Sequence, residues 1–274
     1  MQKLSNPELV RLAREVRRDI IKMIAVSHSG HPGGSLGATD ILVALYFNLM
    51  NHDPAKPDWP ERDRFILSNG HICPALYSVM ARCGYFSLDR LKTLRKLGSS
   101  LQGHPERQRL AGIETTSGPL GSGLAQAAGM ALAARMDGGR SRIYCLTSDG
   151  EHQEGNHWEA VMFAAKNNLS NLTLFVDRNN IQTDDFVENV MPLEPLVEKY
   201  KAFNWHVIDI GGHNFQAIID AVGEAKAVYE NPTVIICHTI AGKGVSFMEN
   251  KFEWHAKAPT EEEKERALKE LRQE

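Results

Sequence analysis

Short apolar runs alternate with helical patterns in the second half of this 274-residue chain, and this alternation constrains the fold more than any other feature. The apolar runs, rich in Ile, Val, Leu and Phe, are Arg142–Thr147, Leu172–Asp177, His206–Ile210 and Thr233–His238. Helical patterns lie between them at His157–Asn167, Leu193–Phe203 and Phe215–Tyr229. Such alternation is typical of βαβ units, whose strands are parallel and whose sheet is covered on both faces. The sequence therefore predicts an α/β fold with a parallel sheet and helices on both faces.

The first half of the chain has a helical and loop-rich pattern without a clear strand. Apolar residues recur at helical spacing from Leu9 to Ile24. Further helices are expected at Thr39–Asn51, at about Pro74–Cys83, from Ser87 to Gly98 and at Leu124–Met136. Thr260 and Glu263 have capping-box spacing, which predicts a charged tail helix at about 260–273. No repeat or low-complexity linker divides the chain, so we expect one domain over residues 1–274.

Composition and charge narrow the class of protein. The 31 Lys and Arg residues nearly balance 34 Asp and Glu residues, without the basic excess of a nucleic-acid binder. No apolar run approaches the roughly 20 residues of a membrane span. The N-terminus lacks the apolar core of a signal peptide. The four cysteines are far apart and form no CxxC pair, as in proteins with reduced thiols. We therefore expect a cytoplasmic protein that binds neither nucleic acid nor membranes.

Polar or glycine-rich loops follow the predicted strands. Because parallel strands end at the same edge of a sheet, these loops are expected to converge there and form a ligand site. Asp149 and Asn179 follow consecutive predicted strands and are 30 residues apart, about one βαβ unit. Carboxylate, amide and backbone oxygens suit Mg²⁺ or Ca²⁺. Either residue alone would also fit a simple turn, but together they favour a metal site.

Histidines and glycines mark further loops of the candidate site. His31, His71 and His104 each have a neighbouring glycine, and a loop imidazole can bind phosphate, move protons or contact a substrate hydroxyl. A structural role remains the alternative for each histidine taken alone. The segment Gly118–Gly123 has the order GxxGxG rather than GxGxxG, and it disfavours a dinucleotide site of the Rossmann type.

Taken together, these segments resemble the transketolase family of thiamine diphosphate enzymes. The shared segments occur in family order and are Ser29–Gly33, Ser68–His71, Gly103–Glu106, Gly118–Gly123, Ser148–Gly150 and Asn179–Asn180. The resemblance covers nearly the whole chain and is to the N-terminal region of transketolase. It implies the thiamine diphosphate-binding fold, with the whole chain as its diphosphate-binding domain.

The resemblance also implies how the cofactor is held. Asp149, Asn179 and the carbonyl of Ile181 would bind Mg²⁺, or Ca²⁺ in its place, against the diphosphate of thiamine diphosphate. Gly150 and His71 would contact the diphosphate itself. The residues bordering the cofactor would be Gly118 and Leu120. The family usually has Gly-Asp-Gly where this chain has Ser148-Asp149-Gly150.

Four more residues acquire roles through the resemblance. His31 and His104 would face the hydroxyls of the donor sugar and assist proton transfer. Glu154 matches an acidic residue that the family places between the two active sites of a dimer. His255 matches a histidine near the diphosphate and the reacting carbon, although Ala256 follows it where a glycine is common.

The implied activity is transfer of a two-carbon ketol unit from a ketose phosphate to an aldose phosphate. In the family, the carboxylate that activates the cofactor lies on a pyrimidine-binding domain, and this chain stops before that domain. We therefore expect the N-terminal subunit of a split transketolase, acting with a separate C-terminal subunit in an α2β2 complex. The alternatives are a subunit of a deoxyxylulose-phosphate synthase or 2-oxo-acid dehydrogenase, and a non-catalytic cofactor-binding module. Pro32 and the intact Gly103–Pro105 loop favour transketolase.

Overall fold

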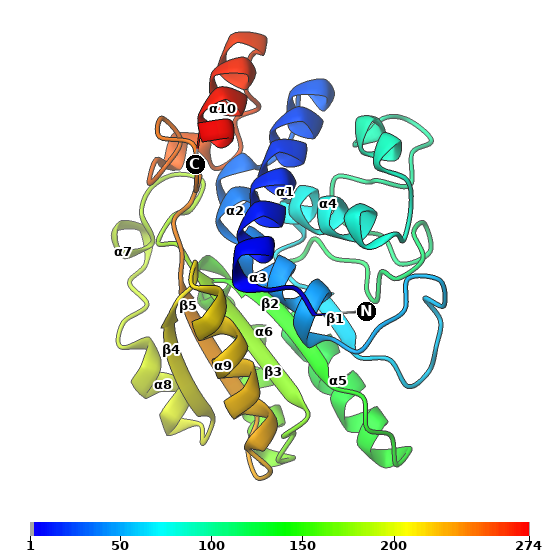
Figure 1. Ribbon diagram of the computed structural model, residues 1–274. Coiled ribbons are helices and arrows are strands. Elements are labelled where there is room, and N and C mark those ends of the chain that lie inside the picture. Colours follow the sequence, from blue (N-terminus) through cyan, green and yellow to red (C-terminus); the bar gives the residue numbers. More distant parts are fainter. Residues whose placement is uncertain (1–2, 274) are drawn as a thin grey trace.

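A five-stranded parallel sheet lies at the centre of the computed structural model, which describes residues 3–273 (Figure 1). Its strand order is β1-β2-β3-β5-β4. The strands are β1 (Arg64–Leu67), β2 (Ile143–Ser148), β3 (Leu172–Arg178), β4 (His206–Gly211) and β5 (Thr233–His238). Every neighbouring pair is parallel, so all five carboxyl ends lie at one edge of the sheet. The predicted α/β fold with a parallel sheet is confirmed.

Strand β1 corrects the prediction that the first half of the chain lacks a strand. It is only four residues long and pairs with β2, with Arg64 opposite Ile143. Its apolar stretch is the three residues Phe65–Leu67, which is too short for periodicity to identify. The strand ends directly before Ser68–His71, so it brings this histidine loop to the same edge as the loops after β2 and β3.

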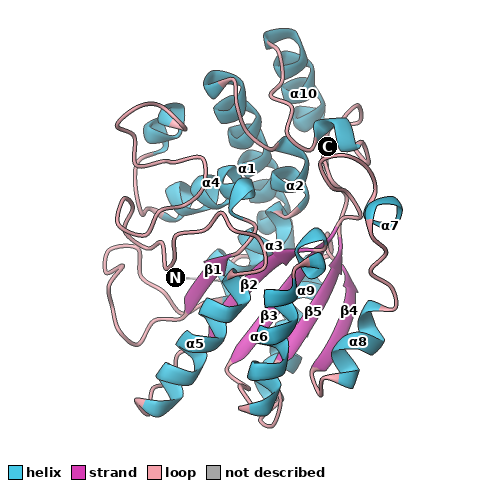
Figure 2. Cartoon of the chain, turned by 180° about the vertical axis from the view of Figure 1, so that it is seen from behind, coloured by secondary structure: helices cyan, strands magenta, loops and turns pink. Residues whose placement is uncertain are grey.

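Helices cover both faces of the sheet, as predicted (Figures 1 and 2). Alternate residues of β2 face opposite layers: Tyr144 and Leu146 belong to one apolar cluster, and Ile143 and Cys145 belong to the other. The first cluster contains residues of α1 (Asn6–Ser27), α3 (Thr39–Ala44), α4 (Cys73–Cys83) and α9 (Phe215–Ala227). Of these helices, α9 lies over the sheet, and α1 and α4 lie beyond the carboxyl ends of the strands (Figure 1). The second cluster contains residues of α5 (Gly123–Met136), α6 (Gly155–Lys166) and α8 (Leu196–Ala202).

The remaining helices are short, apart from the tail helix. They are α2 (Pro32–Gly37), a π-helical turn at Leu45–Leu49, α7 (Val187–Val190), α10 (Glu261–Gln273) and 3₁₀ turns at Gly70–Ile72, Leu88–Thr93, Gly150–Gln153 and Phe252–Trp254. The expected helix from Ser87 to Gly98 is only the 3₁₀ turn, and α8 begins after Pro195 rather than at Leu193. The tail helix α10 agrees with expectation, and the Thr260 backbone N–H donates to Glu263 at 2.8 Å.

A buried polar network joins the helical first half to the sheet. The Asp40 carboxylate on α3 lies 2.6 Å from the Arg17 guanidinium on α1. The same carboxylate oxygen lies 2.6 Å from Nδ1 of His213, and Nε2 of His213 accepts from the backbone N–H of Ile240 at 2.8 Å. Because these residues come from α1, α3 and the loops after β4 and β5, the network fixes the two halves of the chain to each other.

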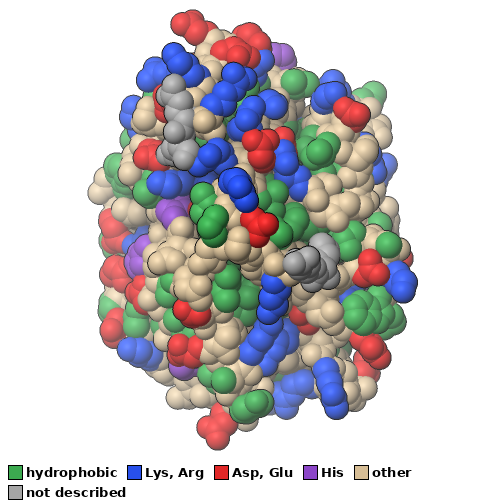
Figure 3. Space-filling model, viewed as in Figure 1, with side chains coloured by type: hydrophobic (Ala, Val, Ile, Leu, Met, Phe, Trp, Pro, Cys, Tyr) green, Lys and Arg blue, Asp and Glu red, His purple; other side chains and the backbone are tan. Residues whose placement is uncertain are grey.

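The outer surface is charged and mixed in sign. Arg11 and Lys22 on α1 are exposed, and Arg18 pairs with Glu15 at 3.1 Å. Figure 3 shows Lys and Arg side chains interspersed with Asp and Glu over this side of the molecule. Among residues 3–273, none of the helices combines the length and apolar character needed to cross a bilayer.

Candidate active site

A cavity of about 370 Å³ opens at the edge where the parallel strands end. Its walls come from the loops after β1, β2, β3 and β5 and from loops of the helical first half. Nearly all candidate residues named from the sequence line it: His31, His71, His104, Gly118, Leu120, Gly150, Glu154, Asn179, Ile181 and His255. Asp149 alone among the candidates does not line this cavity, because its side chain is fully buried beside Gly150.

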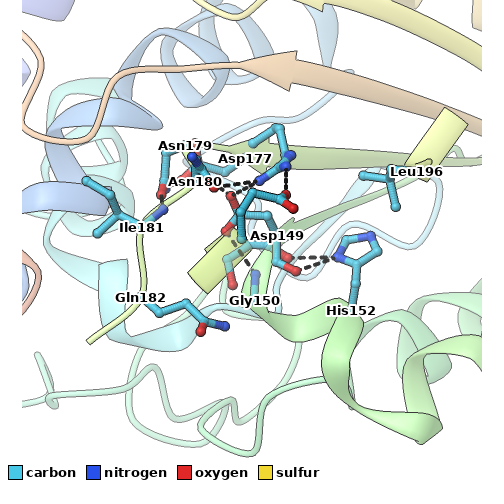
Figure 4. Close-up of polar contacts among 12 residues, drawn as sticks. Asp149, Gly150, His152, Asp177, Asn179, Asn180, Ile181, Gln182 and Leu196 are labelled. Atoms are coloured by element: carbon cyan, nitrogen blue, oxygen red, sulfur yellow. Dashed lines mark hydrogen bonds and ion pairs between the residues drawn. The ribbon is translucent and has the colours of Figure 1, made fainter. Parts of the chain in front are cut away.

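Asp149 is held tightly at the carboxyl end of β2. Its Oδ1 accepts from the Gly150 backbone N–H at 2.8 Å, and its Oδ2 accepts from the Asn180 backbone N–H at 2.5 Å. Oδ2 also lies 3.2 Å from Nη1 of Arg178. Figure 4 shows Asp149 beside Gly150 and the Asn179–Ile181 segment. Burial raises the pKa of Asp149 to about 6, although Arg178 and the backbone donors act in the opposite direction. These contacts fix the carboxylate between the loops that follow β2 and β3.

Arg178 connects Asp149 to a surface segment that the sequence did not single out. Its Nη2 lies 2.7 Å from Glu188 on α7 and 3.1 Å from Glu194, just before α8. The guanidinium is buried, so its charge is shared among three carboxylates. The segment that follows Ile181 is thereby attached to the candidate metal site.

The side chain of Asn179 forms a turn, which was the alternative to a metal site for this residue taken alone. Its Oδ1 accepts from the Ile181 backbone N–H at 3.0 Å, and its Nδ2 donates to Asp177 at 2.8 Å. A side-chain amide oxygen has a second lone pair, and the Asp149 carboxylate has about four acceptor positions for its three donors. The turn contacts therefore leave acceptor positions on both side chains.

The oxygen atoms at this edge suit a hard cation. The residues described here contain no group of three or more His, Cys, Asp or Glu side chains arranged around a metal position. A site for Mg²⁺ does not need such a group, because this ion takes few protein ligands and completes its shell with phosphate oxygens and water. One carboxylate from Asp149, the amide oxygen of Asn179 and the backbone carbonyl of Ile181 are therefore a fitting donor set.

Three imidazole rings form a cluster in the cavity. The ring centroids of His31 and His71 are 5.0 Å apart, and His255 lies 5.5 Å from His31 and 5.3 Å from His71. Burial lowers the pKa of His31 to about 4 and that of His71 well below its usual value, and repulsion from His255 adds to both effects. Burial likewise lowers the pKa values of His104 and His255. These rings are therefore neutral near pH 7, and each can offer a donor and an acceptor.

Several buried polar atoms in the cavity wall have no hydrogen-bond partner. They include Nδ1 of His31 and both polar atoms of the Asn69 side-chain amide. Buried polar groups are normally paired, so orphaned atoms at a cavity are a sign of a polar ligand. The cavity is thus built to receive a molecule with hydrogen-bonding groups.

Arg95 joins the loops that carry two of the cavity histidines. Its Nη1 donates to the Ser29 hydroxyl at 2.7 Å, two residues before His31, and its Nη2 donates to the Gly103 carbonyl at 3.3 Å, directly before His104. Its Nε is buried and has no partner. Sequence reasoning missed several residues of this site, among them Asn69, Asp177 and Gln182 in the cavity wall and the charged residues Arg95, Arg178 and Glu151. Each of the three charged residues stands alone in the sequence, without a local motif.

Glu154 lies at the rim of the cavity, at the start of α6. The neighbouring surface carries exposed apolar side chains at Leu120, which lines the cavity, and at Val190 and Met191, at the end of α7. The Met191 carbonyl accepts from the cavity residue Gln153 at 3.0 Å. Isolated apolar residues on a surface are normal, but several around the mouth of a site are typical of an interaction surface.

A parallel α/β sheet with polar loops at the carboxyl ends of its strands defines a class of folds that bind cofactors and phosphorylated ligands at that edge. Residues 8–273 match the family model described as "Transketolase, thiamine diphosphate binding domain". The chain belongs to the transketolase family and corresponds to its thiamine diphosphate-binding domain. The expected resemblance and the expected fold are therefore confirmed.

Similar proteins include two named as transketolase subunits. The chain is 45% identical over 267 residues to "6-deoxy-6-sulfo-D-fructose transketolase subunit SqwG" of Clostridium sp. (strain MSTE9), with 97% of each chain covered. It is 39% identical to an apulose-4-phosphate transketolase subunit of Actinobacillus succinogenes, with 99% of this chain and 98% of the relative covered. Both relatives are thus matched over nearly their whole length.

Longer transketolases are matched over only part of their length. Human transketolase is 35% identical over 260 residues, which are 94% of this chain and 41% of the relative. The crystal structure of transketolase from Campylobacter jejuni superposes with a TM-score of 0.92 at 34% identity, with 98% of this chain and 43% of that chain covered. The chain therefore spans about two-fifths of these longer relatives.

Proposed function

We propose that this chain is the thiamine diphosphate-binding subunit of a two-chain transketolase, which transfers a two-carbon ketol unit between sugar phosphates. The observation that carries the proposal is the cavity at the strand ends, where four histidines and three polar loops meet. Two relatives matched over nearly their whole length carry the words "transketolase subunit" in their names, which supports the same function.

In this proposal Asp149, Asn179 and the carbonyl of Ile181 hold Mg²⁺, with Ca²⁺ as the alternative ion. Gly150 and His71 contact the diphosphate of thiamine diphosphate. The residues that border the cofactor are Gly118 and Leu120, which line the same cavity. When bound, the cofactor supplies the carbon nucleophile for the transfer, while the protein provides binding and orientation.

The histidines provide hydrogen bonds and proton transfer to the donor sugar. His31 and His104 face the hydroxyls of the donor, and His255 lies near the diphosphate and the reacting carbon. Their lowered pKa values keep the rings neutral, so each ring can both donate and accept a hydrogen bond with a sugar hydroxyl. The unpartnered Nδ1 of His31 supplies one such position.

The complex contains a second type of chain that carries the pyrimidine-binding and C-terminal domains. Two relatives named as transketolase subunits are matched over 97% and 98% of their length, which supports a separate partner. The exposed apolar residues beside the cavity, Leu120, Val190 and Met191, support an interface there. We propose an α2β2 assembly in which Glu154 lies between the two active sites.

The names of the relatives bear on the substrate. They name a sulfonated deoxyfructose and apulose 4-phosphate, and both are sugars with an anionic group. We propose a donor and acceptor of this class, with sugar phosphates as the first compounds to test.

Reconstitution with the second transketolase chain of the same genome tests the proposal. We expect no ketol transfer by this chain alone, and transfer dependent on thiamine diphosphate and Mg²⁺ after mixing. Light scattering is expected to give a mass of two copies of each chain. Asp149→Ala is expected to abolish Mg²⁺-dependent cofactor binding, because it removes the only charged ligand. Full activity of the isolated chain would contradict the two-chain assignment, and cofactor binding without transfer by the mixture would favour a non-catalytic module.

A further inference from the structure

Glu151 is a fully buried carboxylate beside the candidate cofactor site. It lies in the 3₁₀ turn Gly150–Gln153 and its relative exposure is 0%. None of the ion pairs among the described residues includes this side chain. Burial of a carboxylate without a cation lowers the stability of a protein, so its presence calls for a reason other than folding.

The carboxylate receives three hydrogen bonds, two from other loops and one from the end of the strand that leads into its own loop. Its Oε1 accepts from the Ser68 hydroxyl at 2.7 Å and from the Gly121 backbone N–H at 3.1 Å. Its Oε2 accepts from the Ser148 backbone N–H at 3.1 Å. Ser68 follows β1, Gly121 belongs to the Gly118–Gly123 segment, and Ser148 ends β2.

These hydrogen bonds fix the direction of two backbone N–H groups in the glycine-rich segment Gly118–Gly123. The Gly121 N–H donates to Glu151, and the Gly123 N–H donates to the Ser68 hydroxyl at 3.1 Å. Both donors are therefore used inside the protein and do not face the cavity. The fit is close, because a Cβ at Gly123 would lie 2.4 Å from Cβ and Oγ of Ser68. The segment is thus fixed onto the ends of β1 and β2.

Each of the three loops carries residues of the candidate site. The loop of Ser68 continues to Asn69 and His71, and the segment with Gly121 carries Gly118 and Leu120. Ser148 directly precedes Asp149. Glu151 itself does not line the cavity, so it acts through these loops and not by contact with a ligand.

We propose that Glu151 is a positioning residue for the cofactor: it sets the spacing of the three loops that enclose thiamine diphosphate and its metal ion. This inference rests on the proposed function, and it adds a residue that touches neither cofactor nor substrate. Supporting residues of this kind hold binding groups in their productive arrangement at a cost to stability.

The substitution Glu151→Gln distinguishes an effect on cofactor binding from an effect on folding stability. The amide keeps the shape of the side chain, and its oxygen can still accept from Ser68 and Gly121. Its nitrogen then meets the Ser148 N–H, so two donors oppose each other at the residue before Asp149. The neutral amide also avoids the cost of burial that raises the pKa of the Glu151 carboxyl to about 7. We therefore expect weaker cofactor binding without a loss of stability.

The experiment is calorimetric titration of thiamine diphosphate, in the presence of Mg²⁺, into the complex of both chains. Glu151→Gln is expected to raise the Kd about tenfold, which corresponds to about 1.4 kcal/mol. The melting temperature of the cofactor-free protein is expected to stay the same or to rise. Glu230→Gln is the matched control, because Glu230 is exposed and lies before the amino end of β5. A wild-type Kd, or a weaker Kd accompanied by a clear fall in melting temperature, overturns the proposal.

Ser68→Ala tests the connection between Glu151 and the loop after β1 while Glu151 itself stays unchanged. It removes the bond between the β1 loop and Glu151, and we expect a Kd several-fold higher than wild type. If Glu151→Gln does not fold, an unchanged Kd in Ser68→Ala contradicts the proposal. Absence of cofactor binding by the unsubstituted complex is a different result, because it contradicts the proposed function itself.

Discussion

The Arg178 guanidinium lies 3.2 Å from the Asp149 carboxylate, the only charged group in the proposed metal site. A cation from the chain itself therefore neutralises the carboxylate that is proposed to bind a metal. Arg178 also pairs with Glu188 and Glu194, so it keeps two carboxylate partners when Asp149 binds a metal ion. The two cations act on the same buried charge, and their effects on stability are linked.

Arg178→Gln is expected to make the protein more dependent on its metal. Without the guanidinium, Asp149 is a buried charge without a partner, which costs about 3–5 kcal/mol of unfolding free energy. Mg²⁺ with thiamine diphosphate replaces part of the missing charge. The rise in melting temperature upon their addition is therefore expected to be larger in the variant than in wild type, as measured by scanning calorimetry. The control is Arg140→Gln at an exposed site, and an equal rise in Arg178→Gln and wild type would contradict the linkage.

His104→Ala is expected to affect the donor sugar and not the cofactor. Loss of a hydrogen bond to a substrate hydroxyl costs about 1–3 kcal/mol, so the KM for the donor should rise about tenfold. The Kd for thiamine diphosphate should remain at its wild-type value. Steady-state kinetics and calorimetry on the complex measure the two quantities. His206→Ala serves as the control, because His206 begins β4 and pairs with Glu224 outside the cavity. Donor kinetics equal to those of the control would assign His104 a structural role.

Gly123→Ala is expected to disturb the glycine-rich segment. The added Cβ would lie 2.4 Å from Ser68, so the segment must move, at a cost of about 1–3 kcal/mol of unfolding free energy. Gly129→Ala on the same helix is the matched control. Its Cβ meets no atom within 4 Å, and alanine favours a helix by up to about 1 kcal/mol. Chemical denaturation should therefore show opposite changes in stability, and similar stability of the two variants would argue against the close packing at Ser68.

His152 is expected to make stability dependent on pH. Nδ1 of His152 lies 3.0 Å from the Ser148 carbonyl oxygen, and its Nε2 lies 2.8 Å from the Tyr200 hydroxyl. Burial lowers the pKa of His152 to about 4, whereas the unfolded chain titrates near 6.5. The stability due to the neutral ring is therefore complete above about pH 6.5 and is lost as the pH falls towards 4.

Comparison with His152→Gln isolates this effect. The unfolding free energy of wild type minus that of the variant should fall by about 2 kcal/mol from about pH 7.5 to about pH 5. Urea denaturation at several pH values gives the difference, and histidines remote from His152 cancel because both proteins contain them. His157, whose ring centroid lies 4.1 Å from that of His152, is checked in the same way with His157→Gln. A difference that does not change with pH would show that His152 titrates normally in the folded protein.

Much of the fold follows from the sequence because hydrophobic periodicity reports burial. Strands β2 to β5 are six or seven residues long, and their apolar residues mark them clearly. Strand β1 has only three apolar residues, and its pairing with β2 arises from contacts distant in sequence. The strand order, with β5 between β3 and β4, also depends on packing and has no local signal.

The candidate site, like the fold, could be predicted from the sequence only in part. The meeting of Asp149 with the Asn179 loop was predictable, because the ends of parallel neighbours such as β2 and β3 must lie together. The roles of Glu151, Arg178 and Arg95 were not predictable, because a charged residue in or next to a polar loop is usually solvated. Their burial and partners arise only when loops from separate parts of the chain pack against one another.

All candidate groups lie at the carboxyl ends of the strands, which leaves the opposite end of the sheet without them. Tyr229 lies there, in the loop before β5, and its relative exposure is 81%. A fluorescent dye attached at that position, or a linker to a solid support, is separated from the cavity by the length of the sheet. The geometry therefore offers an attachment point for biosensors and for immobilised biocatalysts built from this chain.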